Sequence, residues 1–236
     1  MRLDKMLANS GYGSRKDVKA LLKQGAVSVD GVPVKDPSLH VDPESGSVTV
    51  LGETVDYKEF IYVMMNKPPG VISATEDTRD RTVVDLLPFE LRRFKPFPVG
   101  RLDKDTEGLL LLTNDGKLSH ELLSPKKHVG KTYYAVIEGV VTEEDGEAFR
   151  QGVTLDDGYV TKPAELRILH SALESEIELT ITEGKFHQVK RMFEARGKRV
   201  TYLKRLTMGP LQLDPELGAG VWRELTEEEL LELKNR

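Results

Sequence analysis

The sequence contains no cysteine. Its absence excludes disulfide bonds, cysteine-ligated zinc fingers, iron–sulfur clusters and a thiol nucleophile. Long apolar runs are missing as well, because no segment approaches the ~18 consecutive apolar residues of a membrane helix. Charges at Arg2, Asp4 and Lys5 interrupt the first residues, so we expect no signal peptide. A chain without thiols suits a reducing compartment, and we expect a cytoplasmic protein without a membrane partner.

An excess of positive charge is also absent, because the sequence contains 34 Lys and Arg but 39 Asp and Glu, which gives a net charge of −5. This sum argues against a nucleic-acid partner, but phosphate contacts depend on local patches. Basic residues gather in the segments 2–23, 92–104 and 185–205. Each segment lies beside a motif described below, which favours RNA over an ordinary hydrated surface. The chain has 236 residues, 39% apolar and 31% charged, enough for two folded domains.

Residues 1–57 read as a small separate module. Apolar residues recur at helical spacing in two segments, and Ser14 with Asp17 resembles a capping box at the start of the second. Asp30-Gly31 between two short valine-rich segments predicts a β-hairpin. Two helices, a hairpin and a basic helix face resemble the S4 RNA-binding fold. The resemblance implies that this module binds RNA through its basic side chains, namely Arg2, Lys5, Arg15, Lys16, Lys19 and Lys23.

A polar stretch at 52–60 separates this module from a second domain, which we assign to residues 58–236. Apolar and β-branched patterns predict strands at 61–65, 109–112, 131–137 and 176–182, and the run at 109–112 predicts a strand buried on both faces. Helical periodicity predicts helices at 83–87, 118–122, 143–150 and 187–196, the last with Val189, Met192 and Phe193 buried. Because strands and helices alternate irregularly, we predict an α+β fold with a mixed, mostly antiparallel sheet flanked by helices.

The segment from Gly100 to Gly108 places charged residues directly before the apolar run. Asp103 and Asp105 are two residues apart and would face the same side of an extended backbone. Two such carboxylates could bind a hard metal ion or share acid–base work, and an ordinary charged loop is a third reading. Arg101 and Lys104 favour ionised carboxylates, which suit a nucleophile or base better than a metal site. Spacing alone leaves the choice between the two aspartates open.

Gly100-Arg101-Leu102-Asp103 resembles the catalytic motif of pseudouridine synthases, in the RsuA family that modifies ribosomal RNA. The resemblance implies that Asp103 is the catalytic residue, while Arg101 keeps the place of the displaced base open. It implies that the glycosidic bond of a uridine is cleaved, that the uracil rotates, and that C5 becomes bonded to the ribose. Attack on the sugar and removal of a ribose proton both remain open. Neither route needs a metal or nucleotide cofactor.

Further segments match the family in order. Lys67-Pro-Pro-Gly70 is similar to its first motif, and Tyr133 corresponds to the tyrosine that stacks on the target base. The segment from Glu183 to Met192 resembles the motif that supplies the basic partner of the aspartate. We predict Lys190 as this partner, with Arg191 as the second candidate, and interpret His187 as a structural histidine. By the same resemblance, substrate contacts are assigned to Arg101, Arg191, Lys67 and Arg205.

The segment 117–125, followed by Lys131-Thr-Tyr133, is similar to the small-subunit branch of the family, and the chain ends without a long basic tail. We therefore expect a monomeric enzyme that isomerises one uridine of 16S ribosomal RNA, free or in an assembling small subunit. The same reaction on 23S RNA is the nearest alternative. A non-catalytic S4 protein would be expected to lose Asp103, and a metal-dependent hydrolase would need more ligands than Glu107 beside the two aspartates.

Overall fold

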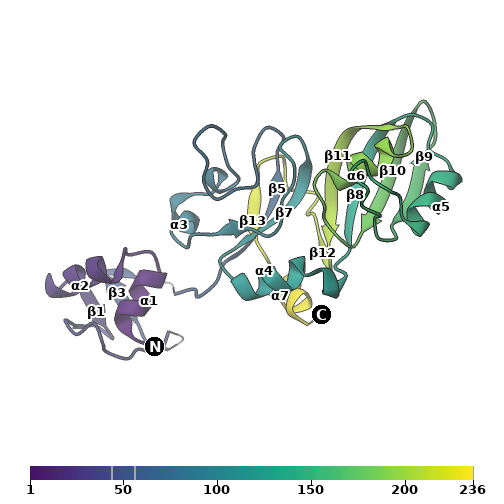
Figure 1. The fold of residues 1–236 in the computed structure, drawn as a ribbon. Coiled ribbons are helices and arrows are strands. Elements are labelled where there is room, and N and C mark those ends of the chain that lie inside the picture. The colour runs from purple at the N-terminus through teal and green to yellow at the C-terminus, as the bar shows by residue number, and fades with distance from the viewer. Residues whose placement is uncertain (44, 56, 236) are drawn as a thin grey trace. The chain divides into compact units, whose positions relative to one another are not determined.

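The computed structural model describes residues 1–43, 45–55 and 57–235, and the chain divides into two units (Figure 1). The first unit comprises Met1–Ile61 with Pro88–Lys95, and the second comprises Tyr62–Leu87 with Pro96–Arg236. The domain boundary at residues 57 and 58 stays a prediction. No helix in the described ranges is both long and apolar enough to cross a membrane.

The N-terminal unit packs two helices on a small sheet. Its sheet has the strand order β2-β1-β3-β4, with every pairing antiparallel. Leu3 and Leu7 of the first helix and Leu22 of the second are fully buried in one apolar core. The elements are α1 (Leu3–Asn9), α2 (Arg15–Lys23), β1 (Val27–Val29), β2 (Val32–Pro33), β3 (Val48–Val50) and β4 (Glu53–Thr54).

The predicted helix start and hairpin of this unit are confirmed. The Asp17 backbone N–H donates to Ser14 Oγ (3.3 Å), and the Ser14 N–H donates to the Asp17 carboxylate (2.8 Å), which completes a capping box. Asp30 and Gly31 both have positive φ, 50° and 78°, as a two-residue hairpin turn of type I′ requires. The polar stretch expected to be a linker contributes β4, so part of it belongs to the sheet.

The second unit is built on a nine-stranded sheet. Its main path is β13-β5-β7-β11-β8-β10-β9, with β12 beside β11 and β6 beside β7, and only β7 and β11 are parallel. This confirms the predicted α+β fold with a mixed, mostly antiparallel sheet. The strands are β5 (Tyr62–Lys67), β6 (Phe97–Pro98), β7 (Glu107–Thr113), β8 (Lys131–Glu138), β9 (Glu165–His170), β10 (Glu174–Ile181), β11 (Arg199–Met208), β12 (Leu211–Gln212) and β13 (Trp222–Glu224).

Strands β5 and β7 form the apolar centre of the sheet. Residues 109–112 are fully buried, which confirms the predicted strand with two covered faces. Helices α4 (Gly116–Leu123) and α7 (Glu227–Lys234) cover one face through Leu118, Leu122 and Leu233 (Figure 1). At Gly108 a Cβ would lie 2.2 Å from the carbonyl oxygen of Arg205, and φ is +103°. Only glycine lets β7 and β11 approach this closely.

Helices α5 (Glu143–Gln151) and α6 (Gln188–Glu194) lie beside β8–β11 (Figure 1). Val189, Met192 and Phe193 of α6 are buried, as predicted, and the Phe193 ring meets Phe149 of α5 edge to face at 5.0 Å. The helix begins one residue later than predicted, because His187 has a left-handed backbone with φ of +49°. The remaining short elements are η1 (Val84–Leu86) and η2 (Pro125–Lys127) in the second unit and α3 (Phe89–Arg92) in the first.

Candidate active site

Asp103 lies in the loop that enters β7, where β7 and β11 pair in parallel. This loop is a turn, because the Thr106 N–H donates to the carbonyl oxygen of Asp103 (3.1 Å). The backbone is therefore a turn here and not extended, although both carboxylates reach the same Lys190 ammonium. The Asp103 side chain is 27% exposed and that of Asp105 is 72% exposed. The two aspartates thus differ in burial, which their spacing could not reveal.

The backbone of this loop is held by three residues from the end of β5 and the turn after it. The Lys67 ammonium donates to the carbonyl oxygens of Thr106 (2.8 Å), Pro68 (3.0 Å) and Lys104 (3.3 Å). The Gly70 N–H donates to the Lys104 carbonyl (2.7 Å). Ser73 Oγ donates to the Leu102 carbonyl (3.0 Å) and lies 3.0 Å from the Leu102 nitrogen. The loop that carries Asp103 is consequently preorganised.

Lys67 is fully buried, so the prediction that it contacts substrate is wrong. Its hydrogen bonds go to backbone carbonyls, and its function is to position the Asp103 loop. Burial lowers the pKa of Lys67 to about 8, while the negative charges of Asp105, Asp103 and Glu107 oppose the shift. The lysine of the Lys-Pro-Pro-Gly segment is therefore a structural cation beside the site.

Lys190 brings the two carboxylates together. Its Nζ lies 3.3 Å from Asp103 Oδ2 and donates to Asp105 Oδ1 (2.7 Å) and Oδ2 (2.9 Å). Burial lowers the pKa of Lys190, but hydrogen bonding to Asp105 and the charges of Asp103 and Asp105 outweigh it, so the net pKa is raised. The hydrogen bond from Lys190 in turn lowers the pKa of Asp105. The first turn of α6 thus supplies a permanent cation to the carboxylate pair.

The cations adjacent to Asp103 in sequence take no part in this pairing. Lys104 donates to Asp80 (2.6 Å) on a neighbouring loop. Arg101 is exposed, and its guanidinium has no hydrogen bond or ion pair within the ranges that the structure describes. Arg101 is therefore available to a bound molecule, while the cation that pairs with Asp103 comes from a residue distant in sequence.

His187 also lies beside Asp103, with 3.6 Å between its Nε2 and Asp103 Oδ1. Its side chain is 40% exposed, and its ring stacks on the ring of Phe186 at a centroid distance of 3.8 Å. His187, interpreted above as a structural histidine, therefore lies at the candidate site. Its left-handed backbone turns the ring toward Asp103, and periodicity carries no signal for that conformation.

The structure does not bring Arg191 and Arg205 to Asp103. Arg191 forms ion pairs with Asp156 and with Asp157 (2.7 Å), so Lys190 is the residue of this pair that meets Asp103. Arg205 is 2% exposed, and its Nε donates to the Leu109 carbonyl (2.7 Å). The predicted substrate contact of Arg205 is therefore wrong, since its side chain is inside the sheet.

Tyr133 lies on β8, opposite Arg205 of β11, and Arg205 pairs in turn with Gly108 at the start of β7. Two strand spacings place its backbone about 10 Å from that of Gly108. Tyr133 is 7% exposed on a buried face, opposite Leu179 of β10. The ring thus belongs to the same region of the sheet as the Asp103 loop.

The six basic residues predicted to bind RNA in the N-terminal unit are all exposed. Of the six, Arg2 forms a salt bridge: its guanidinium donates to both oxygens of the buried Asp4 (3.0 and 2.9 Å). Each of the others is free of salt bridges within the described part of the chain; they are Lys5, Arg15, Lys16, Lys19 and Lys23. These five side chains are available to phosphates.

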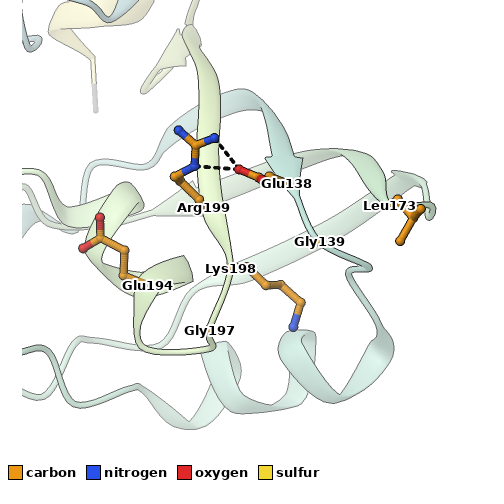
Figure 2. Close-up of a pocket in the computed structure, with 7 residues that line it drawn as sticks. All are labelled: Glu138, Gly139, Leu173, Glu194, Gly197, Lys198 and Arg199. Carbon is orange, nitrogen blue, oxygen red and sulfur yellow. Dashed lines mark hydrogen bonds and ion pairs between the residues drawn. The ribbon is translucent and has the colours of Figure 1, made fainter.

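A hollow at the far end of α6 offers no comparable chemistry. Glu138 and Arg199 at its wall pair with each other, and Glu194 and Lys198 lie at its edge (Figure 2). Within residues 1–43, 45–55 and 57–235, no three metal-ligating side chains are grouped to hold an ion. The Asp103 loop, together with Lys190 of α6, therefore remains the candidate active site.

A carboxylate 3.3 Å from a lysine ammonium, in the loop that enters a buried strand, has the groups that nucleophilic or base catalysis requires. The comparisons identify the class. The family model described as RNA pseudouridylate synthase matches residues 61–195, and the S4 domain model matches residues 1–46. The chain belongs to the RNA pseudouridine synthase family, in its RsuA branch, and carries an N-terminal S4 domain.

Relatives and a solved structure match over nearly the full length. The chain is 62% identical to "Uncharacterized RNA pseudouridine synthase YtzG" of Bacillus subtilis (strain 168), over 98% of this chain and 97% of the relative. It is 40% identical to "Ribosomal small subunit pseudouridine synthase A" of Vibrio cholerae, over 98% of each chain. It is 39% identical to "Ribosomal large subunit pseudouridine synthase B" of B. subtilis, over 99% and 95%. A pseudouridylate synthase crystal structure matches with a TM-score of 0.70 and 37% identity, over 99% of each chain.

Proposed function

We propose that this enzyme isomerises one specific uridine of 16S ribosomal RNA to pseudouridine, with Asp103 as the catalytic carboxylate. The observation that carries the proposal is the contact of Asp103 with Lys190 (3.3 Å) in a chain of the pseudouridine synthase family. The enzyme acts in the cytoplasm as a monomer, on free RNA or on an assembling small subunit.

The reaction exchanges one bond of the ribose for another. Asp103 either attacks the ribose carbon or removes a ribose proton, and the N1–C1′ bond of the uridine breaks. The detached uracil rotates and C5 bonds to C1′. In the first route the bond between Asp103 and C1′ breaks in this step, and in the second the ribose carbon regains the proton that Asp103 had taken. The proton on C5 is then lost while N1 gains one. Lys190 balances the negative charge of Asp103 before this step. A uridine deuterated at C2′ separates the two routes, because only proton removal slows with deuterium.

The target uridine must leave its stack to reach Asp103, which costs a few kcal/mol. Tyr133 supplies a stacking partner for the extruded base, and such stacking is worth ~1–3 kcal/mol. The unpaired guanidinium of Arg101 takes the space that the base leaves. The five exposed cations of the S4 unit add affinity for phosphates away from the pocket.

The similarity to a small-subunit synthase over nearly the whole chain supports the 16S assignment. The relative named as a large-subunit synthase is almost equally similar, so 23S RNA is the competing substrate. The non-catalytic reading is disfavoured because Asp103 is present together with Lys190 and the loop contacts of Lys67.

The test is carbodiimide mapping of pseudouridine on unmodified 16S and 23S transcripts, free and in partial ribosomal particles. We expect one new signal in 16S RNA with the wild-type enzyme and none with Asp103→Asn. A signal in 23S RNA alone would overturn the 16S assignment. Binding without any signal would instead favour the non-catalytic S4 reading.

A further inference from the structure

Phe186 is an exposed aromatic side chain at the entrance of the candidate active site. It is 75% exposed, the highest value for any phenylalanine in the described ranges. Its ring stacks on that of His187, with the planes inclined by only 18° and the centroids 3.8 Å apart. One face of the phenyl ring is therefore covered by His187, while most of the remaining ring surface meets solvent.

The turn that carries this pair is fixed by hydrogen bonds of its neighbours, of which the one between Gln188 and Glu183 is buried. Gln188 is 3% exposed; its Oε1 accepts from the Lys185 N–H (2.9 Å), and its Nε2 donates to Glu183 (2.8 Å). Arg191 Nη1 donates to the carbonyl oxygen of Phe186 (3.3 Å). An exposed ring on such a turn loses little conformational freedom when a ligand stacks on it.

The position of the pair ties it to the reaction. His187 Nε2 lies 3.6 Å from Asp103 Oδ1, and Phe186 supplies the second ring of the stack. Lys185, one residue before Phe186, is also exposed and could meet a phosphate. The His187 ring lies between Asp103 and the Phe186 ring. The Phe186 ring is therefore placed to contact the nucleotide next to the one that reacts at Asp103.

We propose that Phe186, backed by His187, is a stacking platform for the unpaired RNA base next to the flipped uridine. Every nucleobase has a flat π face, so such a platform adds affinity and holds the strand without reading one particular sequence. Apolar burial does not explain the ring, because it contributes almost nothing to the core. The inference rests on the RNA substrate of the proposed function but not on the choice between 16S and 23S RNA.

The test uses two 12-nucleotide probes, oligouridylate and the same oligomer built from dihydrouridine. Dihydrouridine keeps the charge and the carbonyl groups but lacks a planar ring. The full-length wild-type protein should bind oligouridylate more tightly. Phe186→Ala should weaken oligouridylate binding about 5- to 100-fold and dihydrouridine binding less than twofold, as measured by fluorescence anisotropy.

Two further variants make the result decisive. Phe186→Trp should restore tight binding of oligouridylate, and Leu173→Ala should change nothing, although Leu173 is 84% exposed. The slope of affinity against salt should be the same for wild type and Phe186→Ala, because stacking releases no counterions. Equal weakening of both probes, or no weakening of either, would overturn the platform. Neither result depends on turnover, so mapping of pseudouridine tests the proposed function separately.

Discussion

Lysine and arginine do different work in the two units of this molecule. In the N-terminal unit, five basic side chains are exposed and form no salt bridge within the described part of the chain. Around the Asp103 loop two cations are covered and engaged: Lys67 donates to three carbonyl oxygens, and Lys190 contacts two carboxylates. The same residue types thus serve phosphate binding in one region and the positioning of a reactive group in the other.

The difference is one of environment. An exposed ammonium is screened by salt and binds a phosphate by releasing counterions. A covered ammonium interacts strongly with nearby oxygens and is little affected by salt. Mutations in the first region should therefore change affinity and its salt dependence, and mutations in the second should change the reaction rate or the stability.

The largest expected effect belongs to Asp103→Asn. This change keeps the size of the side chain but removes the charge that Lys190 balances, so the single-turnover rate should fall by about 10⁴-fold or more. Binding should stay within about threefold of wild type, because the substitution leaves every phosphate-binding cation in place. Quench-flow and anisotropy on the same RNA measure both, and near-normal turnover would remove Asp103 from the mechanism.

Gly108→Ala should give the next largest effect, this time on stability. The new methyl group would lie 2.2 Å from the Arg205 carbonyl oxygen at a φ of +103°, so β7 and β11 would have to separate. We expect a loss of roughly 3 kcal/mol or more in the free energy of unfolding, measured with urea. Gly158→Ala is the matched control, because it also has positive φ, 83°, but no atom within 4 Å of the added Cβ. Equal losses in both variants would refute the close approach of the strands.

A moderate effect is expected when charge is removed from α2. Replacing Lys16, Lys19 and Lys23 together by Gln should weaken RNA binding about 10- to 100-fold near 0.1 M salt. The slope of log affinity against log salt should fall by about 0.7–0.9 for each phosphate that the variant no longer neutralises. The rate at saturating RNA should change much less than the affinity. An unchanged salt slope would mean that these lysines do not face the RNA.

Asp105→Asn should give the smallest effect and one that depends on pH. Hydrogen bonding to Lys190 lowers the pKa of Asp105 in the folded state, so its contribution to stability is present above the ordinary value of 3.8 and is lost as the pH falls through the lowered value. Because the carboxylate is 72% exposed, the contribution at pH 7 should be below about 1 kcal/mol. Urea unfolding at pH 7 and pH 3 should show a smaller gap between wild type and variant at the lower pH.

The sequence predicted much of the fold, because the helix caps, the Asp-Gly hairpin and the apolar run at 109–112 act locally. Strand β11 escaped prediction although it is the longest in the sheet. Bulges beside Val200 and Arg205 shift its register and break the alternation of buried and exposed residues. Local pattern could not reveal it, since the shifts arise from pairing with β8.

The candidate site was predicted more unevenly. The family resemblance pointed to Asp103 and to Lys190, and the structure brings these two together. The resemblance could not show that Lys67 and Arg205 are buried, because the sequence of a motif is the same whether its lysine or arginine contacts substrate or backbone carbonyls. The place of His187 beside Asp103 could not be foreseen either, because a residue with a left-handed backbone lies outside any periodic pattern.

The comparison between covered and exposed cations is tested most directly by two single substitutions, Lys190→Met and Lys19→Met. Single-turnover rates at saturating RNA and dissociation constants at two salt concentrations are measured for both, with thermal melts to verify folding. We predict that Lys190→Met lowers the rate by about 100-fold or more with an unchanged salt slope, while Lys19→Met weakens binding and reduces the slope. A normal rate for Lys190→Met, together with weaker and less salt-dependent binding, would contradict the assignment of Lys190 to the catalytic carboxylate.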